Sequence, residues 1–293
     1  MNSTHKAGFV SIVGKPNVGK STLMNKLVGE NLSIITNKAQ TTRHRIMGIL
    51  NGEDFQIVYS DTPGILEPKY ALHEAMMNYV KVSLEDADVI LLVVEYGERF
   101  DSSVYERFKT VTAPVLLLIN KVDKVPMKER KQVIDYWKGV IPAREILAVS
   151  ALTGENVEKI FPSLLSLLPE HPAYFPKEDL TNRSERFFAS EMIREKIFQN
   201  YNQEIPYSTE VGIEDFKDEE TIIRIRATIF VERDSQKGIL IGKAGSSLKK
   251  VGTEARLDME KFFGKKIFLE TRVKVAADWR KQKDKLRSFG YLE

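Results

Sequence analysis

One loop near the N-terminus combines glycines, a lysine and a hydroxyl group in the spacing G-x-x-x-x-G-K-[ST]. Its residues are Gly14, Lys15, Pro16, Asn17, Val18, Gly19, Lys20 and Ser21, with Thr22 directly after them. The glycines let backbone N–H groups turn toward a phosphate chain. Lys20 adds a positive charge and Ser21 a hydroxyl ligand for Mg²⁺. The loop predicts a nucleoside triphosphate site, with an ordinary turn between a strand and a helix as the alternative.

A second polar loop, Asp61-Thr62-Pro63-Gly64, follows the apolar run Phe55 to Tyr59. Open α/β sheets bind their ligands at the carboxyl ends of the strands, so Asp61 is placed to hold Mg²⁺ through water. Gly64 can bring a backbone N–H to the γ-phosphate, which would make it a hinge that is released after hydrolysis. Taken alone, the same residues also fit a simple turn.

A third loop, Asn120-Lys121-Val122-Asp123, predicts which base is bound. The carboxylate of Asp123 can accept hydrogen bonds from both N1–H and N2–H of guanine. Adenine offers no matching donors and would leave the charge unpaired, which discriminates strongly. Asn120 can tie this loop to the phosphate loop, and the Lys121 stem can cover the base.

Two shorter stretches complete the predicted site. Ser150 and Ala151 are small enough to bring backbone N–H groups to a base carbonyl, and Leu152 follows them. A threonine in Gln40-Thr41-Thr42-Arg43 can complete Mg²⁺ coordination when the γ-phosphate is present. We assign this role to Thr42, with Thr41 as the alternative. The predicted metal ligands are therefore Ser21, Thr42 and Asp61.

The elements that must position these loops recur as short apolar runs separated by helical segments. The runs are Phe9 to Val13, Phe55 to Tyr59, Val89 to Val94, Val115 to Ile119 and Ile146 to Val149. The helices are expected at Lys20 to Val28, His73 to Leu84, Ser103 to Thr110, Lys128 to Lys138 and Asn156 to Leu168. This alternation predicts a doubly wound, mostly parallel sheet. Asn51-Gly52 predicts a hairpin and therefore one antiparallel edge strand.

Length and composition suggest two domains in a protein of the cytoplasm. The chain has 293 residues, of which 42% are hydrophobic and 29% charged, and it has no cysteine. Disulfides and thiolate sites are thereby excluded. The longest aliphatic run, Val89 to Val94, is too short to span a bilayer, and Met1 to Gly8 lacks the apolar core of a secretory signal.

Three prolines, Pro169, Pro172 and Pro176, mark a linker between the predicted domains. We expect a nucleotide-binding domain over residues 1–169, a linker over 170–183 and a smaller α+β domain over 184–293. In that last domain we expect a helix at Glu185 to Asn200, strands at Ser208 to Phe216, Thr221 to Glu232 and Lys266 to Val275, and a helical stretch at Gly238 to Phe263.

The C-terminal half also carries a basic excess and a G-x-x-G loop. Residues 233–287 hold 16 basic and 7 acidic side chains, which favours a polyanionic partner. A G-x-x-G loop between helices allows close approach of a single-stranded nucleic-acid backbone. The predicted RNA-binding residues are Ile241, Gly242, Lys243, Ala244, Gly245, Lys249 and Lys250. A solvated basic face and a plain helix–helix turn are the alternatives. The Trp279 region either extends this surface or forms a terminal helix, which we prefer.

Together, the nucleotide motifs resemble those of translation-factor-type GTPases, and the variant Gly-Lys-Pro-Asn-Val-Gly-Lys-Ser with Gln-Thr-Thr-Arg-His-Arg resembles the Era family. The C-terminal domain resembles a KH domain of bacterial-type topology. This resemblance implies a GTPase that binds GTP, GDP and Mg²⁺. It also implies binding near the 3′ end of 16S rRNA during assembly of the small (30S) ribosomal subunit, by a cytoplasmic monomer that can associate peripherally with the inner membrane.

The residue after Gly64 sets the expected rate of hydrolysis. Many GTPases have a glutamine there that orients the attacking water, and here it is Ile65. We therefore expect slow intrinsic turnover that rests on Lys20, Thr42, Gly64 and Mg²⁺. Resemblance to GTPases with this replacement implies that Asn17 helps to hold a K⁺ near the phosphates. Thr62, Pro63 and Ile65 complete the predicted nucleotide contacts.

Two other functions fit part of the same sequence. One is an RNA chaperone that uses GTP only as a structural ligand, and the other is a membrane-surface regulatory GTPase whose basic face binds anionic lipid. The G-x-x-G loop favours RNA over lipid.

Overall fold

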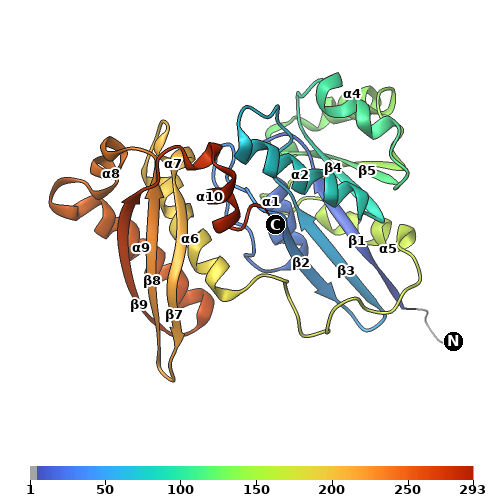
Figure 1. Cartoon of the computed structure of the whole chain (residues 1–293). Coiled ribbons are helices and arrows are strands. Elements are labelled where there is room, and N and C mark those ends of the chain that lie inside the picture. The colour runs from blue at the N-terminus through green and yellow to red at the C-terminus, as the bar shows by residue number, and fades with distance from the viewer. Residues whose placement is uncertain (1–4, 293) are drawn as a thin grey trace. The chain divides into compact units, whose positions relative to one another are not determined.

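The apolar runs of the N-terminal half form a six-stranded sheet in the computed structural model, which describes residues 5–292 (Figure 1). Its strands are β1 (Lys6–Val13), β2 (Ile46–Asn51), β3 (Phe55–Asp61), β4 (Val89–Glu95), β5 (Val115–Asn120) and β6 (Glu145–Ala148). Their order is β2-β3-β1-β4-β5-β6, and β2 alone among these strands pairs antiparallel. The predicted doubly wound sheet with one antiparallel edge is confirmed.

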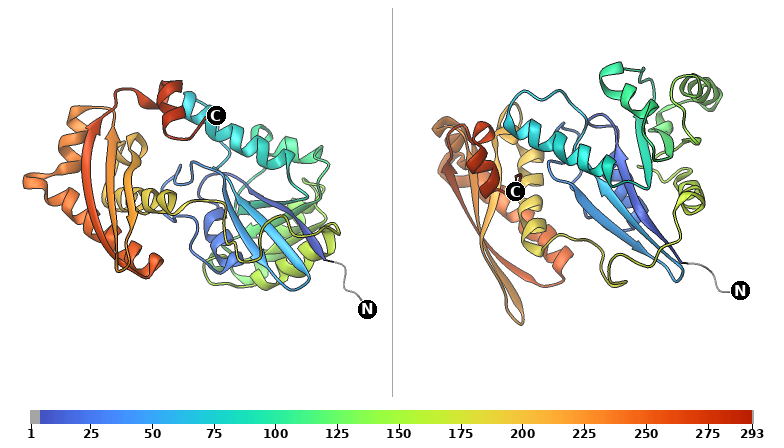
Figure 2. Two further views of the ribbon diagram at one scale, coloured as in Figure 1. Left: turned by 60° about the horizontal axis from the view of Figure 1, so that its bottom comes forward. Right: turned by 45° about the vertical axis from the view of Figure 1, so that its right-hand side comes forward.

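Helices cover both faces of this sheet, which is why its central strands are apolar on both sides. The helices are α1 (Lys20–Val28), α2 (Ala71–Glu85), α3 (Ser102–Tyr105), α4 (Met127–Lys138) and α5 (Ile160–Leu167), with 3-10 turns η1 (Glu106–Lys109), η2 (Val122–Lys124) and η3 (Val157–Lys159). Side chains of α2, α3 and α4, such as Val80, Tyr105 and Trp137, share a core with Leu92 and Leu117 of the sheet. Figure 2 shows α1 and α5 on the opposite face.

Two of the predicted helices in this half are divided. The expected helix over Ser103 to Thr110 is α3 followed by η1, and the one over Asn156 to Leu168 is η3 followed by α5. Such tight 3-10 turns are common at helix ends, where side-chain periodicity hardly distinguishes them from an α-helix. The core positions are unaffected, since Phe108 and Val157 are both buried.

The proline-rich segment over residues 169–182, which follows α5, is bound to strands β2 and β3. We call this segment the strap. Gln56 is fully buried; its Nε2 donates to the carbonyl oxygen of Phe175 at 2.8 Å, and its Oε1 accepts from the backbone N–H groups of Tyr174 at 2.7 Å and Phe175 at 3.0 Å. Farther along, Ile49 N donates to the carbonyl of Leu180 at 2.8 Å. The backbone groups of the predicted linker therefore pair with a buried glutamine of β3 and with β2.

A second sheet and its helices form the other unit. Its elements are α6 (Glu185–Asn200), α7 (Ile205–Ser208), β7 (Glu210–Asp218), β8 (Ile222–Val231), α8 (Asp234–Ile241), η4 (Lys243–Gly245), α9 (Ser246–Phe263), β9 (Lys266–Val275), η5 (Trp279–Lys281) and α10 (Lys283–Ser288). The central strand β8 pairs antiparallel with β7 and parallel with β9. Ile193 of α6 and Val251 of α9 share a core with Ile225 of β8.

The units divide the chain near the end of the strap, with one exception. The first unit comprises the described residues up to Pro68 together with Met76–Asn182, and the second comprises Lys69–Ala75 and the described residues from Arg183 onward. The predicted linker therefore belongs to the first unit up to Asn182. The short segment Lys69–Ala75 joins the second unit, which the sequence did not indicate.

The helical stretch predicted from Gly238 begins earlier in the structure, at Asp234, and the predicted G-x-x-G loop separates α8 from α9. Of the two alternatives for the Trp279 region, the structure has short helical elements, η5 and α10. Trp279 itself is buried, and its Nε1 donates to the carbonyl oxygen of Ser208 at 2.8 Å. The terminal helix that we preferred is α10.

Over residues 5–292, no helix is both long and apolar enough to cross a membrane.

The strap generates a prediction about Gln56. Gln56→Ala should leave the N–H groups of Tyr174 and Phe175 without their buried partner, at a cost of about 1 kcal/mol for each lost hydrogen bond. Hydrogen exchange followed by mass spectrometry should show faster exchange in residues 173–181. For comparison, Thr181→Val removes the hydroxyl bond to the Met47 carbonyl and leaves Gln56 in place. Unchanged exchange in Gln56→Ala would mean that the strap is held by other contacts.

Candidate nucleotide site and nucleic-acid interface

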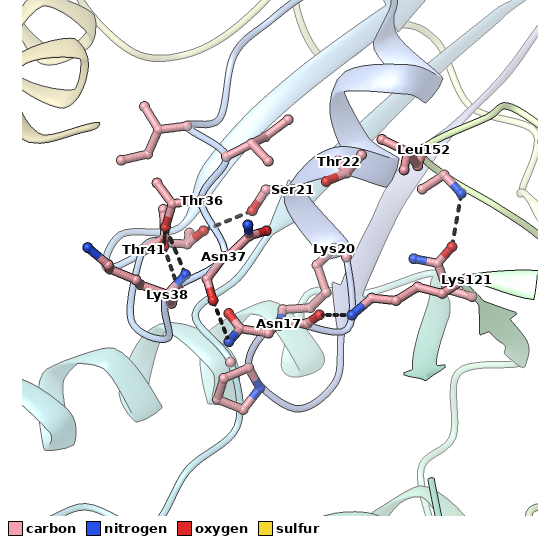
Figure 3. Close-up of a pocket in the computed structure, with 18 of the residues that line it drawn as sticks. Asn17, Lys20, Ser21, Thr22, Thr36, Asn37, Lys38, Thr41, Lys121 and Leu152 are labelled. Carbon is pink, nitrogen blue, oxygen red and sulfur yellow. Dashed lines mark hydrogen bonds between the residues drawn. The ribbon is translucent and has the colours of Figure 1, made fainter. Parts of the chain in front are cut away.

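The loops that carry the predicted nucleotide residues surround one cavity of about 470 Å³ in the first unit (Figure 3). They follow β1, β3, β5 and β6, whose parallel arrangement brings their carboxyl ends to the same edge of the sheet. The lining residues are Pro16, Asn17, Gly19, Lys20, Ser21, Thr22, Ile34, Ile35, Thr36, Asn37, Lys38, Gln40, Thr41, Thr42, Gly64, Asn120, Lys121, Asp123, Lys124, Ala151 and Leu152.

The phosphate loop is closely packed against the loop after β3. The Ile65 N–H donates to the carbonyl oxygen of Gly14 at 3.0 Å. A Cβ atom on Gly64 would lie 2.6 Å from Pro16 Cα, so only glycine fits here. Asn17 has a positive φ of 64°, a conformation that asparagine tolerates better than most residues. The packing and the backbone conformation of the loop therefore depend on Gly64 and Asn17.

Lys20 is buried beneath this loop. Its Nζ donates to the carbonyl oxygens of Lys15 at 2.8 Å and Gly14 at 3.2 Å. Burial lowers the pKa of Lys20 to about 8, although the charges of Asp61 and Glu98 oppose this change. A phosphate group brought into the cavity would stabilise the ammonium form, because an opposite charge at short range favours ionisation.

The Lys15 side chain does not line the cavity, although we predicted a nucleotide contact for this residue. Its Nζ pairs with Asp101 at 2.9 Å and with Glu98 at 3.5 Å. Its contribution to the loop is the backbone carbonyl that receives Lys20. Lys15 therefore acts on the loop from outside the cavity.

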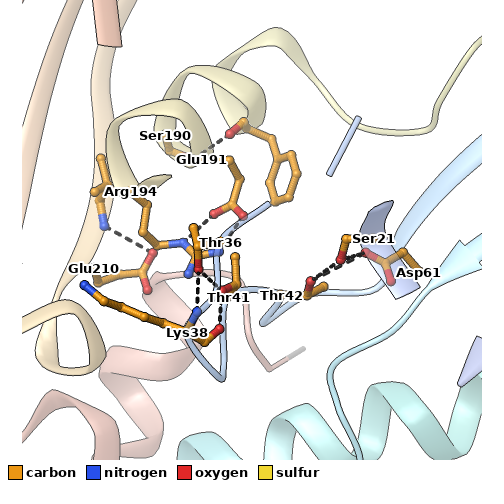
Figure 4. Close-up of polar contacts among 12 residues, drawn as sticks. Ser21, Thr36, Lys38, Thr41, Thr42, Asp61, Ser190, Glu191, Arg194 and Glu210 are labelled. Atoms are coloured by element: carbon orange, nitrogen blue, oxygen red, sulfur yellow. Dashed lines mark hydrogen bonds and ion pairs between the residues drawn. The ribbon is translucent and has the colours of Figure 1, made fainter. Parts of the chain in front are cut away.

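Three oxygen-bearing side chains meet at the start of α1 (Figure 4). Ser21 Oγ donates to Asp61 Oδ2 at 2.6 Å and lies 2.9 Å from Thr42 Oγ1, which is 3.5 Å from the same carboxylate oxygen. Asp61 is fully buried, and burial raises its pKa, while the hydrogen bond from Ser21 and the charge of Lys20 lower it.

This cluster fits Mg²⁺ in its chemistry, since hydroxyl and carboxylate oxygens are hard ligands. The buried Oδ1 atom of Asp61 has no hydrogen-bond partner within residues 5–292, which leaves it able to orient a metal-bound water. Thr41 lies apart from the cluster and its hydroxyl donates to the Lys38 carbonyl oxygen at 2.7 Å. The geometry therefore favours Thr42 over Thr41.

The two predicted base-reading loops are linked to each other through Asn120. Its Nδ2 donates to the carbonyl oxygen of Val18 at 2.8 Å, and its Oδ1 accepts from the Ala151 N–H at 2.9 Å. Ser150 Oγ donates to Asp123 Oδ1 at 2.6 Å. The Asn120 amide thus connects the phosphate loop with both base-reading loops. Its link to the phosphate loop was predicted from the sequence, and its link to Ala151 was not.

Lys121 also links its loop to the phosphate loop. It has a positive φ of 66°, and its Nζ donates to the carbonyl oxygen of Asn17 at 2.7 Å and pairs with Glu95 at 2.9 Å. Lys121 lines the cavity, where we expect its stem to cover the base. Leu152, 76% exposed, forms an apolar rim.

Several predicted residues support the cavity without lining it. Thr62 Oγ1 donates to the Ile12 carbonyl at 2.8 Å, and Ile65 is buried among core residues. The residues that we predicted but that do not line the cavity are Gly14, Lys15, Val18, Asp61, Thr62, Pro63, Ile65 and Ser150.

Conversely, residues 34–38 contribute much of the lining, and we did not predict them from the sequence. These residues include Thr36, Asn37 and Lys38. No motif marks these residues, and the polar character of the stretch before Thr42 was the one feature of the sequence that could have indicated them.

The glycine loop of the second unit exposes the side chains that we predicted to contact RNA. Lys243, Ala244, Lys249 and Lys250 are exposed. Gly242 has a φ of 72°, and a Cβ on it would meet Ser247 Oγ at 2.2 Å, so this position requires glycine. The loop separates α8 from α9 with little side-chain bulk, which leaves its backbone accessible.

A phosphate-loop α/β unit followed by a three-stranded α+β unit with a glycine loop defines a P-loop GTPase that carries a KH domain. Residues 9–121 match the family model described as 50S ribosome-binding GTPase, and residues 204–280 match the KH domain model. The chain is also 46% identical to GTPase Era of Syntrophus aciditrophicus (strain SB), over 98% of this chain and 96% of that protein. It belongs to the Era family of GTPases.

Solved structures agree over the whole length. A crystal structure of Era in complex with MgGDPNP and nucleotides 1506–1542 of 16S ribosomal RNA matches with a TM-score of 0.95 and 40% identity, covering 99% of this chain and 100% of that one. A variant of Aquifex aeolicus Era bound to GDP and aluminium fluoride matches with a TM-score of 0.94 and 40% identity, covering 98% of this chain and 100% of that one. The predicted family, fold and GTPase class are confirmed.

Asp123 provides a test of the base-reading loops. Asp123→Asn keeps the size of the side chain but replaces an acceptor with a donor, so it should weaken GTP binding by a factor of about 100 or more. It should also improve binding of xanthosine triphosphate, whose carbonyl replaces the guanine amino group. Fluorescent-nucleotide competition would measure both. Equal loss for both nucleotides would contradict this reading.

Proposed function

We propose that this protein is a GTP-hydrolysing switch that binds 16S rRNA near its 3′ end through the KH domain and assists assembly of the 30S ribosomal subunit. The observation that carries the proposal is the full-length match to Era in complex with MgGDPNP and a 16S rRNA segment. The proposal has the protein act in the cytoplasm as a monomer.

In this proposal the nucleotide is held by groups that the fold has already positioned. Backbone N–H groups of the phosphate loop and the start of α1 bind the phosphates, and Lys20 neutralises their charge. Asp123 pairs with N1–H and N2–H of guanine while the Ala151 N–H faces its carbonyl. Bound Mg²⁺ would be held by Ser21 and Thr42, with Asp61 behind, and would supply positive charge to the phosphates.

Hydrolysis in this proposal depends on positioning, since the side chain after Gly64 cannot orient water. Ile65 is 4% exposed and packed in the core of the first unit, which supports a slow intrinsic rate. The Asn17 amide nitrogen donates to the Asn37 carbonyl oxygen at 3.2 Å, so the amide oxygen is the atom that would ligate K⁺.

Covalent continuity supports coupling between nucleotide and KH unit. The loop of Gly64 leads directly into Lys69–Ala75, which belongs to the second unit. Within that unit the Arg280 guanidinium lies over the Tyr70 ring, 5.1 Å from its centroid, and pairs with Glu232. A change in the order of the Gly64 loop would therefore act on a segment that belongs to the second unit and contacts Arg280 there.

The RNA part of the proposal is tested with Ala244→Asp. The substitution adds a negative charge at an exposed position, and aspartate tolerates the positive φ of 50° found there. Affinity for an RNA that copies the 3′ end of 16S rRNA should fall about tenfold or more, while GTP affinity stays unchanged. Fluorescence anisotropy with GDPNP and with GDP would measure it.

Lys217→Ala, on the exposed end of β7, removes a positive charge away from the loop and serves as the control. Anionic lipid vesicles are included as competitors. Unchanged RNA affinity in Ala244→Asp would contradict the KH interface, and displacement of the RNA by vesicles would favour a membrane-surface GTPase. Multiple-turnover phosphate release that RNA stimulates would exclude a purely structural role for GTP.

A separate prediction concerns the monovalent cation. GTP turnover should be faster in KCl than in NaCl at equal ionic strength, and Asn17→Ala should remove this difference because it removes the ligand oxygen. Single-turnover phosphate release would give the rates, and GDP affinity would show that the loop is intact. Equal rates in the two salts for the unmodified protein would exclude the K⁺ site.

A further inference from the structure

We propose that Arg130 and Glu155 form a positioning pair that sets the spacing of the two base-reading loops and thereby determines selectivity for guanine. The inference rests on the proposed reading of guanine by Asp123 and Ala151. It adds two residues that belong to none of the nucleotide motifs and that do not line the cavity.

Arg130 lies in the first turns of α4 and reaches back to the loop that precedes this helix. Its Nη2 donates to the carbonyl oxygen of Val122 at 2.9 Å, and its Nε donates to that of Val125 at 3.4 Å. These carbonyls bracket the 3-10 turn that carries Asp123. The guanidinium therefore holds the backbone of the base-selecting carboxylate from behind.

The same guanidinium binds the end of the other loop. Its Nη1 lies 2.5 Å from Glu155 Oε1 and its Nη2 lies 3.3 Å from Glu155 Oε2, a two-pronged contact that fixes orientation as well as distance. Glu155 in turn closes the loop that begins at Ser150, since its carbonyl oxygen accepts from the Ser150 N–H at 3.0 Å. Arg130 thus holds both loops at once.

The pair complements the bridge on the cavity side. There, Ser150 Oγ donates to Asp123 Oδ1. With one bridge facing the nucleotide and the other behind the loops, neither loop can tilt without breaking hydrogen bonds. A bidentate contact with a base edge requires such control, because small displacements of a reading group remove one of its two hydrogen bonds.

A general stabilising role is a weaker explanation for this pair. The side chains of Arg130 and Glu155 are 17% and 37% exposed, and ion pairs near the surface contribute little to folding. A plain loss of stability would also reduce binding of every nucleotide in the same proportion. Loss of loop spacing would instead reduce selectivity.

The test compares GTP with inosine triphosphate, which lacks the 2-amino group that Asp123 reads. Affinities of both nucleotides would be measured by competition for Arg130→Met, Arg130→Lys, Glu155→Gln and the double variant Arg130→Met/Glu155→Gln. Lys131→Ala, which removes an exposed positive charge from the next position of α4, is the matched control.

We expect the ratio of GTP to inosine triphosphate affinity to fall at least fivefold in Arg130→Met and to be partly restored in Arg130→Lys. The double variant should be no worse than Arg130→Met, because the two residues act as one unit. Lys131→Ala should keep the ratio of the unmodified protein, and thermal unfolding would confirm that each variant is folded.

The experiment distinguishes failure of the proposed base-reading site from failure of the proposed positioning role. If the unmodified protein and Asp123→Asn bind the two nucleotides with the same ratio, the proposed base-reading site is wrong. If Asp123→Asn changes the ratio of GTP to inosine triphosphate affinity but Arg130→Met leaves this ratio unchanged, the positioning role of Arg130 is overturned. The proposed base-reading site would then stand.

Discussion

The nucleotide site depends above all on the side-chain amide of Asn120. Its two ends bind the backbone of the phosphate loop, at Val18, and that of the loop at Ala151. Gly19 must lack a side chain for this to happen, because a Cβ there would lie 2.3 Å from Asn120 Nδ2. A single buried amide at the end of β5 therefore holds the phosphate loop and the loop at Ala151 together.

Around this amide, the site holds charges that are poorly solvated. Burial lowers the pKa of Lys20 and raises that of Asp61, so both charged forms are disfavoured before ligand binds. A triphosphate and a divalent cation bring the opposite charges that these groups lack. Such ligands would therefore stabilise the charged forms of Lys20 and Asp61, because an opposite charge at short range favours ionisation.

Sequence alone predicted what fixed motifs and short-range periodicity determine. The sheet, the glycine loops and the link from Asn120 to the phosphate loop follow from residue type at the end of a strand, and the same reasoning placed Asp123 at the cavity. The sequence did not predict contacts between residues that are far apart in the chain. Gln56 accepts hydrogen bonds from backbone groups 118 and 119 positions away. Arg130 contacts Glu155 because the fold brings the two residues together. No local sequence pattern marks residues 34–38 as lining residues, because they reach the cavity through the path of the chain between α1 and β2.

Thr42, Ser21 and Asp123 line one cavity, in which we propose that they bind a single nucleotide. A crystal structure with Mg²⁺ and a non-hydrolysable GTP analogue tests it most directly. The account predicts both hydroxyl oxygens at about 2.1 Å from the metal, with Asp123 bound to the guanine edge. A metal coordinated without Thr42, or a base lying away from Asp123, would contradict it.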